Sequence, residues 1–325
     1  MRILITGASG FIGSHLVEGA LERGHEVWAG VRETSSRRYL TDSRIHFIML
    51  DLNDIVRLTE QLENAGEFDV IIHAAGVIAC SHPKQFHEGN AVTTANLTSV
   101  CRTRRFIYLS TLGTFGPVRE ERPFTPILES DAQCPDTAYG KSKLEAEKAV
   151  MASGLKYVIF RPTGVYGPRE HDYYKLARSV KMRFDFIAGF GSQSITFLYV
   201  KDLVNAVFLA VDKGVSDKTY FVSDGGTYSS RDFSLSVAQE LGHRWTFHIK
   251  VPMFLLWTAS ALVGGITSAF GKSSTLNLDK YRILRQRNWQ CDITALQRDL
   301  GYKPEWPLQR GVSETVASYK ADGLI

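Results

Sequence analysis

Near the start of the chain the sequence reads Thr6-Gly7-Ala8-Ser9-Gly10-Phe11-Ile12-Gly13, directly after an apolar run and directly before a helical pattern. Gly7 permits a tight turn, Gly10 lets the backbone come close to a pyrophosphate, and Gly13 allows a helix to pack closely on a strand. The N-terminus of the following helix would offer N–H donors and a partial positive charge to phosphate groups. Glycines at this spacing are a weak signal alone, but their place between a strand and a helix predicts a dinucleotide-binding turn. The alternative is a glycine-rich turn that binds nothing.

The alternation of strand and helix continues through the first 162 residues. Helices are expected at 11–23 and 139–152, and continuous β-branched runs predict strands that are covered on both faces. These strands are expected at Ile3 to Thr6, Glu26 to Val31, His46 to Leu50, Val70 to His73, Phe106 to Ser110 and Tyr157 to Phe160. Repeated strand–helix–strand units predict an α/β fold with a doubly wound parallel sheet, of the Rossmann type, over residues 1–162.

Residues 163–325 are expected to form a smaller mixed α/β substrate lobe that is interleaved with the first domain. Later segments should complete the sheet, and the lobe should close over its mouth, where open α/β folds bind ligands. The expected elements are a strand at 219–222 and helices at 201–211, at 231–241 with a Ser229 or Ser230 cap, from near Asp292, and at 308–321.

The second expected strand ends in Val31-Arg32, where NAD-binding domains usually place an acidic residue that takes both ribose hydroxyls. A carboxylate there would repel the additional phosphate of NADP, whereas a guanidinium attracts it and can form two hydrogen bonds with it. Ser35, Arg37 and Arg38 follow closely and would complete a phosphate site. The sequence therefore predicts NADP(H) in preference to NAD(H), with NAD(H) as the second choice. The alternative is a solvated basic loop.

Tyr139 and Lys143 are four residues apart in an expected helix, so their side chains share one face. A lysine cation about 5 Å from the phenol would lower its pKa by about two units at an effective dielectric constant of about 20. Tyr139 would then move a proton to or from a carbinol oxygen while a nicotinamide moves a hydride. Thr111, which follows the strand ending at Ser110, would hydrogen-bond the reacting oxygen. The Tyr–Lys spacing alone is common on helices and usually structural.

These features, taken in order, resemble the extended (atypical) short-chain dehydrogenases/reductases of the NAD-dependent epimerase/dehydratase superfamily. The resemblance also rests on Asp51-Leu52, His73-Ala74-Ala75-Gly76, Asn90, Arg161 to Pro168 (R-P-T-G-V-Y-G-P), Phe197 to Leu203 and Leu300 to Pro304. It implies that Thr111 is the hydroxyl member of the active site, Tyr139 the acid/base and Lys143 the cation that holds the ribose. Asn90 matches the family's asparagine that braces the active-site strands.

The sequence gives two sets of expected ligand contacts. Those with the cofactor are expected at Gly7, Ser9, Gly10, Phe11, Ile12, Gly13, Arg32, Arg37, Asp51, Leu52, Ala74, Ala75, Gly76, Asn90, Ser110, Pro162 and Thr163. Those with the substrate are expected at Val165, Tyr166, Tyr199 and Trp257.

Departures from the family pattern bear on the substrate. Dehydratases of this superfamily carry Asp-Glu directly after the threonine, where this chain has Leu112 and Gly113. Many nucleotide-sugar enzymes have an asparagine at the place of Gly164, where it holds a diphosphate. The R-P-T-G-V-Y-G-P run resembles more closely the 3β-hydroxysteroid dehydrogenase and dihydroflavonol reductase branches. The expected function is therefore interconversion of a hydroxyl and a ketone on a hydrophobic, steroid- or flavonoid-like small molecule. The alternatives are a nucleotide-sugar epimerase and a non-catalytic NAD(P)-binding sensor.

Composition and residue spacing argue against a nucleic-acid partner and a bound metal. The net charge of +4 is not gathered into the basic stripe typical of nucleic-acid-binding proteins. The widely spaced cysteines and isolated histidines lack the spacing of a metal site, so no metal is expected. The first residues are needed as a strand and do not read as a signal peptide, which favours the cytoplasm.

One stretch, from Val251 to Gly271, contains no charged residue. Its length would suit a membrane span, but Pro252, two glycines and several hydroxyl side chains dilute its hydrophobicity. We therefore expect a segment that is buried in the protein or lines an apolar pocket, and no membrane span. The family resemblance alone suggests a homodimer formed through helices beside the sheet.

Overall fold

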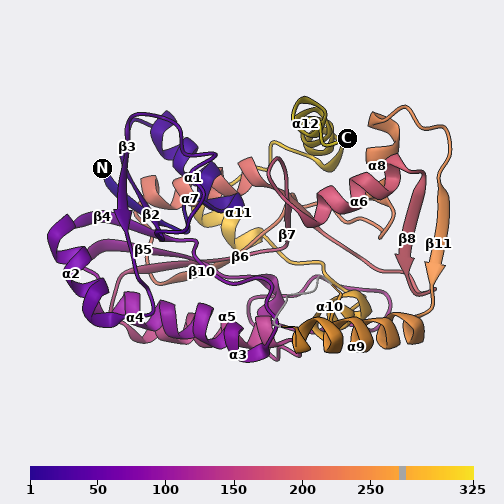
Figure 1. The fold of residues 1–325 in the computed structure, drawn as a ribbon, viewed down its shortest axis with the longest axis horizontal. Helices are drawn as coiled ribbons and strands as arrows, with labels where there is room; N and C mark the ends of the chain where they lie inside the picture. Colours follow the sequence, from indigo (N-terminus) through magenta and orange to yellow (C-terminus); the bar gives the residue numbers. More distant parts are fainter. Residues whose placement is uncertain (271–275) are drawn as a thin grey trace.

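The structure, a computed structural model, describes residues 1–270 and 276–325. Its centre is a parallel sheet of seven strands (Figure 1). The strands are β1 (Arg2–Thr6), β2 (Glu26–Val31), β3 (Ile45–Met49), β4 (Phe68–His73), β5 (Thr103–Leu109), β6 (Tyr157–Pro162) and β10 (Lys218–Val222). Their order in space is β10-β6-β5-β4-β1-β2-β3. The doubly wound parallel sheet predicted from the sequence is confirmed.

Helices cover both faces of the sheet, and each face has its own core. In β1, Ile3 and Ile5 pack into one apolar cluster and Leu4 packs into another. The first face is covered by α1 (Phe11–Glu22), α7 (Val200–Lys213) and α11 (Thr294–Leu300), and the second by α2 (Ile55–Ala65), α4 (Thr93–Val100) and α5 (Ala138–Ala152) (Figure 1). Because neither face meets water, the strands are continuous apolar runs.

The strand order reverses direction beside β1. β2 and β3 lie on one side of β1, and β4, β5, β6 and β10 extend the sheet on the other side. The chain therefore leaves β1 and β4 in opposite directions after Thr6 and His73. Open α/β sheets bind their ligands in the crevice at such a point.

Thr6 and His73, at the ends of β1 and β4, form a hydrogen-bonded chain with α4 at the base of this crevice. The Thr6 hydroxyl lies 2.6 Å from Nδ1 of His73, and Nε2 of His73 lies 3.0 Å from the Thr94 hydroxyl on α4. Burial, with a smaller contribution from the Lys143 cation, lowers the pKa of His73 to about 3. The imidazole is therefore neutral near pH 7 and acts as a hydrogen-bonded link between β1, β4 and α4.

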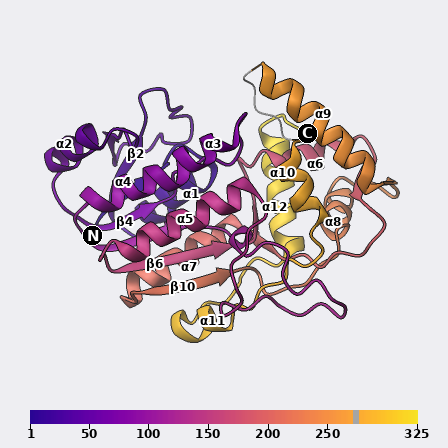
Figure 2. The same ribbon diagram turned by 90° about the horizontal axis from the view of Figure 1, so that it is seen from below.

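Residues after Pro162 contribute both to the sheet domain and to the region beyond the carboxyl ends of its strands. β10 completes the sheet beside β6, and α7 packs against α1, so these later segments belong with the first domain. Beyond the carboxyl ends of the strands lie β7 (Gly164–Tyr166), α6 (Asp172–Lys181), β8 (Phe184–Ala188), β9 (Phe197–Tyr199), α8 (Asp232–Glu240), β11 (Phe247–Val251), α9 (Met253–Ala269), α10 (Leu278–Arg285) and α12 (Leu308–Ala321) (Figures 1 and 2). β7 pairs with β9 and β8 pairs with β11, each in a two-stranded parallel sheet.

The cap predicted for α8 is not found. The residue before the helix is Arg231, and neither Ser229 nor Ser230 caps it. Instead, the Asp232 carboxylate accepts a hydrogen bond from the Ser229 N–H at 2.6 Å, and the Ser229 hydroxyl accepts one from the Arg231 N–H at 3.3 Å. Both bonds hold the turn that precedes α8, and the N-cap residue Arg231 makes no side-chain capping hydrogen bond.

The uncharged stretch forms α9, and its large side chains are not buried. Phe254 is 67% exposed, Trp257 52% and Leu262 66%. The expectation of a segment buried in the protein was therefore wrong for these side chains, since the side turned toward the protein carries smaller residues such as Ser260 and Gly264. Gly271, the last residue of that stretch, lies outside the described residues. Among residues 1–270 and 276–325, no helix is both long and apolar enough to cross a membrane.

Candidate active site

The glycine turn after β1 has the conformation that its sequence requires. Gly7 has φ +66°, and a Cβ on it would lie 2.7 Å from the backbone nitrogen of Ala75. A Cβ on Gly13 would overlap the Gly7 carbonyl group, so helix and turn can approach only because this residue is glycine. Gly10 precedes the first residue of α1, whose first N–H groups face the turn. The turn thus combines close backbone approach with the positive end of a helix.

A cavity of about 420 Å³ opens above this turn at the point where the strand order reverses. Many residues predicted to contact the cofactor line it: Gly7, Ser9, Gly10, Arg32, Asp51, Leu52, Ala74, Ala75 and Gly76. Ser35, expected in the phosphate site, also lines it, and the structure adds lining residues that were not on the list of expected contacts: Thr6, Gly30, Val31, Leu50, Asn53, Val77, Gln85, Glu88, Gly89 and Thr93. The size, the glycine turn and the helix N-terminus fit a dinucleotide.

The other predicted cofactor residues are not among the described residues that line this cavity. They are Phe11, Ile12, Gly13, Arg37, Asn90, Ser110, Pro162 and Thr163. Arg37 has its guanidinium 4.3 Å from the centre of the Phe47 ring, and the Thr163 hydroxyl donates to the Thr196 carbonyl at 2.9 Å. Cofactor contacts by these residues stay predictions.

The end of β2 carries no acidic side chain toward the cavity. Val31, the exposed Arg32 and Ser35 form its rim, and the Arg32 N–H donates to the Ser35 hydroxyl at 3.0 Å. The Asp51 carboxylate, further along the rim, accepts from the Asn53 N–H at 3.1 Å. This rim therefore presents a cation where a ribose or its phosphate would lie.

Tyr139, Thr111 and Lys143 lie close together near Gly76 of this cavity, although none of the three is among the described residues that line it. Tyr139 lies in the first turn of α5, and Thr111 follows β5 directly and hydrogen-bonds the Tyr139 hydroxyl. Lys143, one turn further along α5, donates to the Leu109 carbonyl at 2.6 Å. A Cβ on Gly76, which lines the cavity, would lie 3.9 Å from Nζ of Lys143. The three residues predicted from the sequence thus form one cluster beside the cavity.

Burial controls the protonation of this cluster, against our expectation for the tyrosine. Burial raises the pKa of Tyr139 to about 12, and the hydrogen bond with Thr111 only partly offsets it. Burial also lowers the pKa of Lys143 to about 7, opposed by the nearby Glu147 carboxylate. The predicted lowering of the phenol pKa by the lysine is therefore not found, because the lysine is itself removed from water and bonded to a carbonyl. Near pH 7 the phenol keeps its proton.

Asn90 connects the lining of the cavity to α5 through side-chain hydrogen bonds. Its side-chain oxygen accepts from the Val77 N–H at 2.7 Å, and its amide donates to the Val77 carbonyl at 3.0 Å and to the Ser142 hydroxyl at 2.9 Å. Asn90 lies in a π-helical turn, η1 (His87–Val92), which follows α3 (Pro83–Phe86). Such turns often occur at functional sites. The helical irregularity also explains why periodicity did not indicate Gln85, Glu88 and Gly89 as lining residues.

A buried ion pair between Glu147 and Arg161, next to this cluster, was not predicted from the sequence. Glu147, with no exposed surface, accepts from Nη2 of Arg161 at 2.8 Å, from Gln133 at 3.0 Å and from the Ser110 hydroxyl. The helical spacing could have indicated Glu147, because it follows Lys143 by the same four residues that separate Lys143 from Tyr139. The pair holds the end of β5, next to Thr111, against α5.

The first turn of α5 also has a partner from a distant part of the chain. The N–H groups of Ala138 and Tyr139 donate to one carboxylate oxygen of Asp279, at 2.8 and 3.2 Å. Asp279 lies in the first turn of α10, which packs against α9. The Thr137 hydroxyl caps the same helix by accepting from the Gly140 N–H at 3.0 Å.

The residues predicted to contact the substrate do not form one site: three lie in or against one aromatic core, and the fourth lies on α9. Tyr166 and Tyr199 have no exposed surface and belong to an aromatic cluster with Phe233, so they are core residues and correct the prediction. Val165 is partly buried against the same core, and Trp257 projects from α9. The motifs singled out the two tyrosines, but spacing alone could not show that their rings point inward.

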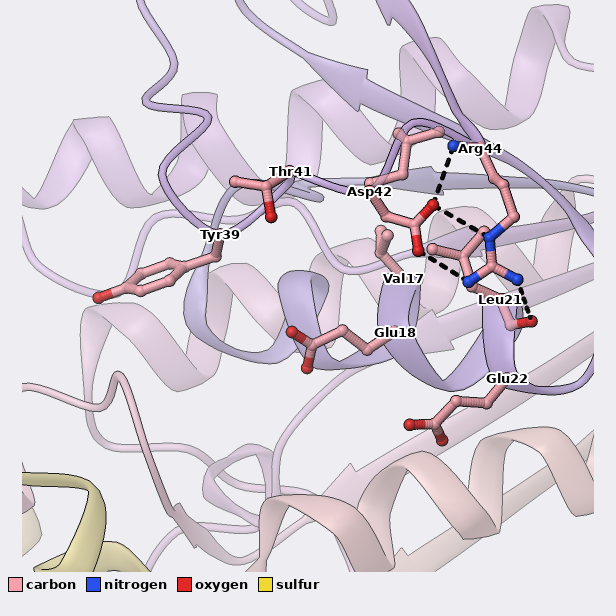
Figure 3. A pocket seen from close by; sticks show the side chains of 9 residues that line it. Val17, Glu18, Leu21, Glu22, Tyr39, Thr41, Asp42 and Arg44 are labelled. Carbon is pink, nitrogen blue, oxygen red and sulfur yellow. Dashed lines mark hydrogen bonds and ion pairs between the residues drawn. The ribbon is translucent and has the colours of Figure 1, made fainter. Parts of the chain in front are cut away.

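A second cavity, of about 270 Å³, lies between α1 and the segment before β3 (Figure 3). Glu18, Glu22 and Asp42 border it, and the Arg44 guanidinium is bonded to Asp42 and to the Leu21 carbonyl. That pairing lowers the pKa of Asp42 to about 2. None of the residues predicted to contact the cofactor lines this cavity, whereas nine of them line the larger one, so the candidate active site is the larger cavity.

Comparisons with known proteins agree with this geometry. A sequence model of the NAD dependent epimerase/dehydratase family matches residues 3–223. The chain is 28% identical to the UDP-glucose 4-epimerase of Vibrio cholerae, over 98% of this chain and 95% of that protein. It is 24% identical to the decarboxylating sterol-4-alpha-carboxylate 3-dehydrogenase of Dictyostelium discoideum, over 87% and 94%. The crystal structure of Thermotoga maritima UDP-glucose 4-epimerase with UDP-glucose has a TM-score of 0.78 and 22% identity, with 99% of each chain covered.

Proposed function

Because the chain belongs to the NAD-dependent epimerase/dehydratase family, we propose that it is an NAD(P)-dependent oxidoreductase that interconverts a hydroxyl and a ketone on a hydrophobic small molecule. One observation carries the proposal: Tyr139, whose hydroxyl is bonded to Thr111, lies one helical turn from Lys143, and the amino group of Lys143 is close to Gly76 in the cavity formed by the glycine turn. The relatives named above are enzymes, and a non-catalytic sensor has no use for an acid/base cluster.

In this proposal each residue of the cluster has a separate task. A bound nicotinamide cofactor supplies or accepts the hydride. Tyr139 holds its proton at neutral pH and donates it to the carbonyl oxygen of the substrate, which suits the reductive direction. Thr111 orients that oxygen, and Lys143, near Gly76, holds the ribose.

The surroundings of Gly164 support a substrate other than a nucleotide sugar. A Cβ at this position would overlap the Tyr173 hydroxyl, so an asparagine that holds a diphosphate would require the Tyr173 side chain to move. The Leu112-Gly113 pair begins a short 3-10 helix, η2 (Leu112–Thr114), and offers no acid or base for dehydration. The nucleotide-sugar epimerase stays as the second candidate, because the Vibrio cholerae relative is matched over nearly the whole chain.

A turnover assay separates the two candidates. With NADPH and a panel of steroid, flavonoid and long-chain ketones, we expect absorbance of the reduced cofactor to fall with at least one of them. An epimerase would instead convert UDP-glucose to UDP-galactose with no net change in cofactor. That second result, with no lipophilic ketone consumed, would reject the proposed oxidoreductase.

The cation at the end of β2 leads to a prediction on the cofactor. Arg32→Ala should lower kcat/KM for NADPH by about 10- to 100-fold, as expected when a charge-assisted hydrogen bond to a phosphate is lost. kcat/KM for NADH, which has no such phosphate, should change little. Arg57→Ala, which removes an exposed arginine from α2, is the matched control and should affect neither cofactor. Equal values for NADPH and NADH in the parent enzyme would contradict the preference.

A further inference from the structure

The apolar helix α9 has its large side chains on the outside. Phe254, Trp257, Leu262 and Ile266 are each more than half exposed, whereas Ser260 has no exposed surface. In a helix that packs only on its own protein, large apolar side chains face the core and polar ones face water. The order is reversed here, which indicates that the outer side of α9 is covered by something other than this chain.

The neighbouring two-stranded sheet continues this surface. Phe184 and Phe247 are register partners in β8 and β11 with ring centres 5.9 Å apart, and Phe186 is the partner of Ile249. Trp245 contacts Phe247 with ring centres 4.9 Å apart. All five side chains are more than a third exposed. The outer apolar face thus comprises Phe184, Phe186, Trp245, Phe247 and Ile249 of the sheet region and Phe254, Leu255, Trp257, Leu262, Val263, Ile266 and Phe270 of α9 and its end.

The two parts of this face are physically joined. The Gly189 N–H, directly after β8, donates to the Val251 carbonyl at 2.8 Å, and a Cβ on Gly189 would touch the Met253 side chain at the start of α9. β8, β11 and α9 accordingly lie together at one end of the molecule (Figure 1). The sheet part and the helix part of the face are therefore direct neighbours.

Positive charge surrounds the outer apolar face, and negative charge is missing from it. Residues 241–278 contain no Asp or Glu. Lys181, Arg244 and Lys250 are exposed, and no ion pair between described residues involves them. Asp185 of β8 is 3% exposed and points inward, where His248 lies 2.9 Å from it. The one carboxylate on these strands is thus withdrawn from the surface.

We propose that this face docks on an anionic membrane surface, with α9 lying in the plane of the interface. Aromatic and aliphatic side chains enter the boundary between headgroups and acyl chains, and flanking Lys and Arg bind anionic headgroups. α9 is about 26 Å long at 1.5 Å per residue and carries no charge, but its inner side is held by α10, so it lies on the bilayer rather than across it. The proposal is independent of the reaction catalysed.

The charges favour a lipid surface over a second copy of the chain. A two-fold symmetric contact through this face would place the cations of both copies in one interface, to which residues 241–278 contribute no acidic side chain. Arg244 and Lys250 would then have no acidic partner from this region. An anionic bilayer supplies the missing negative charge.

Vesicle flotation with the purified full-length chain tests the proposal. We expect binding to phosphatidylcholine vesicles that contain phosphatidylglycerol, weaker binding to pure phosphatidylcholine, and loss of binding as salt is raised. Arg244→Ala/Lys250→Ala should lower the partition coefficient by about 30-fold, the effect of removing two cations near an anionic surface. Phe254→Glu/Trp257→Glu should abolish binding at any lipid composition.

Matched variants at a distance act as controls. Val56→Glu makes the same apolar-to-acidic change on α2, and Lys148→Ala/Lys156→Ala removes two exposed cations elsewhere; both should bind as the parent does. Circular dichroism should show the same fold in all variants, since only exposed side chains change. The proposal is overturned if the parent ignores vesicles, or if the α9 variants float as well as the controls. It is also overturned if the parent forms dimers without lipid that Phe254→Glu/Trp257→Glu abolishes.

Discussion

Replacing Tyr139 by phenylalanine is expected to lower kcat by about 10²- to 10⁴-fold, the usual loss when a positioned general acid is removed. The phenol is the group that hydrogen-bonds Thr111 beside the cofactor cavity, and its pKa of about 12 keeps it protonated near pH 7. The substitution removes one oxygen and leaves the ring, which packs with its centre 5.8 Å from that of Phe86. Fluorescence titration with NADPH should therefore give an almost unchanged Kd, while steady-state kinetics shows the loss in kcat.

Tyr174→Phe is the matched control for this experiment. Its hydroxyl donates to the Leu324 carbonyl at 3.4 Å near the surface, far along the chain from the cluster. Turnover should be close to that of the parent. If Tyr139→Phe kept full turnover, the acid/base assignment and with it the proposed reaction would have to be abandoned.

The second large effect is expected on stability, from Glu147→Gln. The substitution leaves the Arg161 guanidinium buried without its carboxylate, and it weakens the bonds to Gln133 and Ser110. Breaking a buried pair on one side typically costs about 3–5 kcal/mol, because a buried charge is left uncompensated. Urea unfolding followed by circular dichroism should show the free energy of unfolding reduced by about that amount.

Glu145→Gln, two residues earlier on the same helix, is the matched control. Its carboxylate lies 2.6 Å from His87, but both side chains are about half exposed, so the loss should be at most about 1 kcal/mol. The double variant Glu147→Met/Arg161→Met should recover part of the stability, since both charges are removed together. Equal effects of Glu147→Gln and Glu145→Gln would show that the buried pair contributes nothing special.

The parts of the structure that local chemistry determines were predictable. The continuous apolar runs gave the six N-terminal strands, because a strand covered on both faces has no place for polar alternation. The glycine turn and the Tyr139, Lys143 and Thr111 cluster followed from spacing together with strand ends. The helix at 308–321 was predicted with the bounds that the structure has.

Features that depend on three-dimensional burial were not predictable. The pKa of Tyr139 moves upward because of its surroundings, whereas the sequence showed only a lysine four residues away. Likewise, the motif around Tyr166 could not reveal a ring with no exposed surface. The absence of charge in α9 suggested burial, but composition alone does not distinguish a covered core segment from an exposed apolar face.

The bonds from Asp279 to the first turn of α5 connect the helix that carries Tyr139 to a part of the chain beyond the region matched by the family model. The family pattern extends over residues 3–223, which hold the sheet, the glycine turn and all three members of the catalytic cluster. Yet the amide of the catalytic tyrosine is anchored by a carboxylate that comes more than fifty residues after that region ends. A fragment cut to the matched region would retain the glycine turn and the three proposed catalytic residues but lose the Asp279 anchor, so the proposed alignment of Tyr139 depends on a later part of the chain.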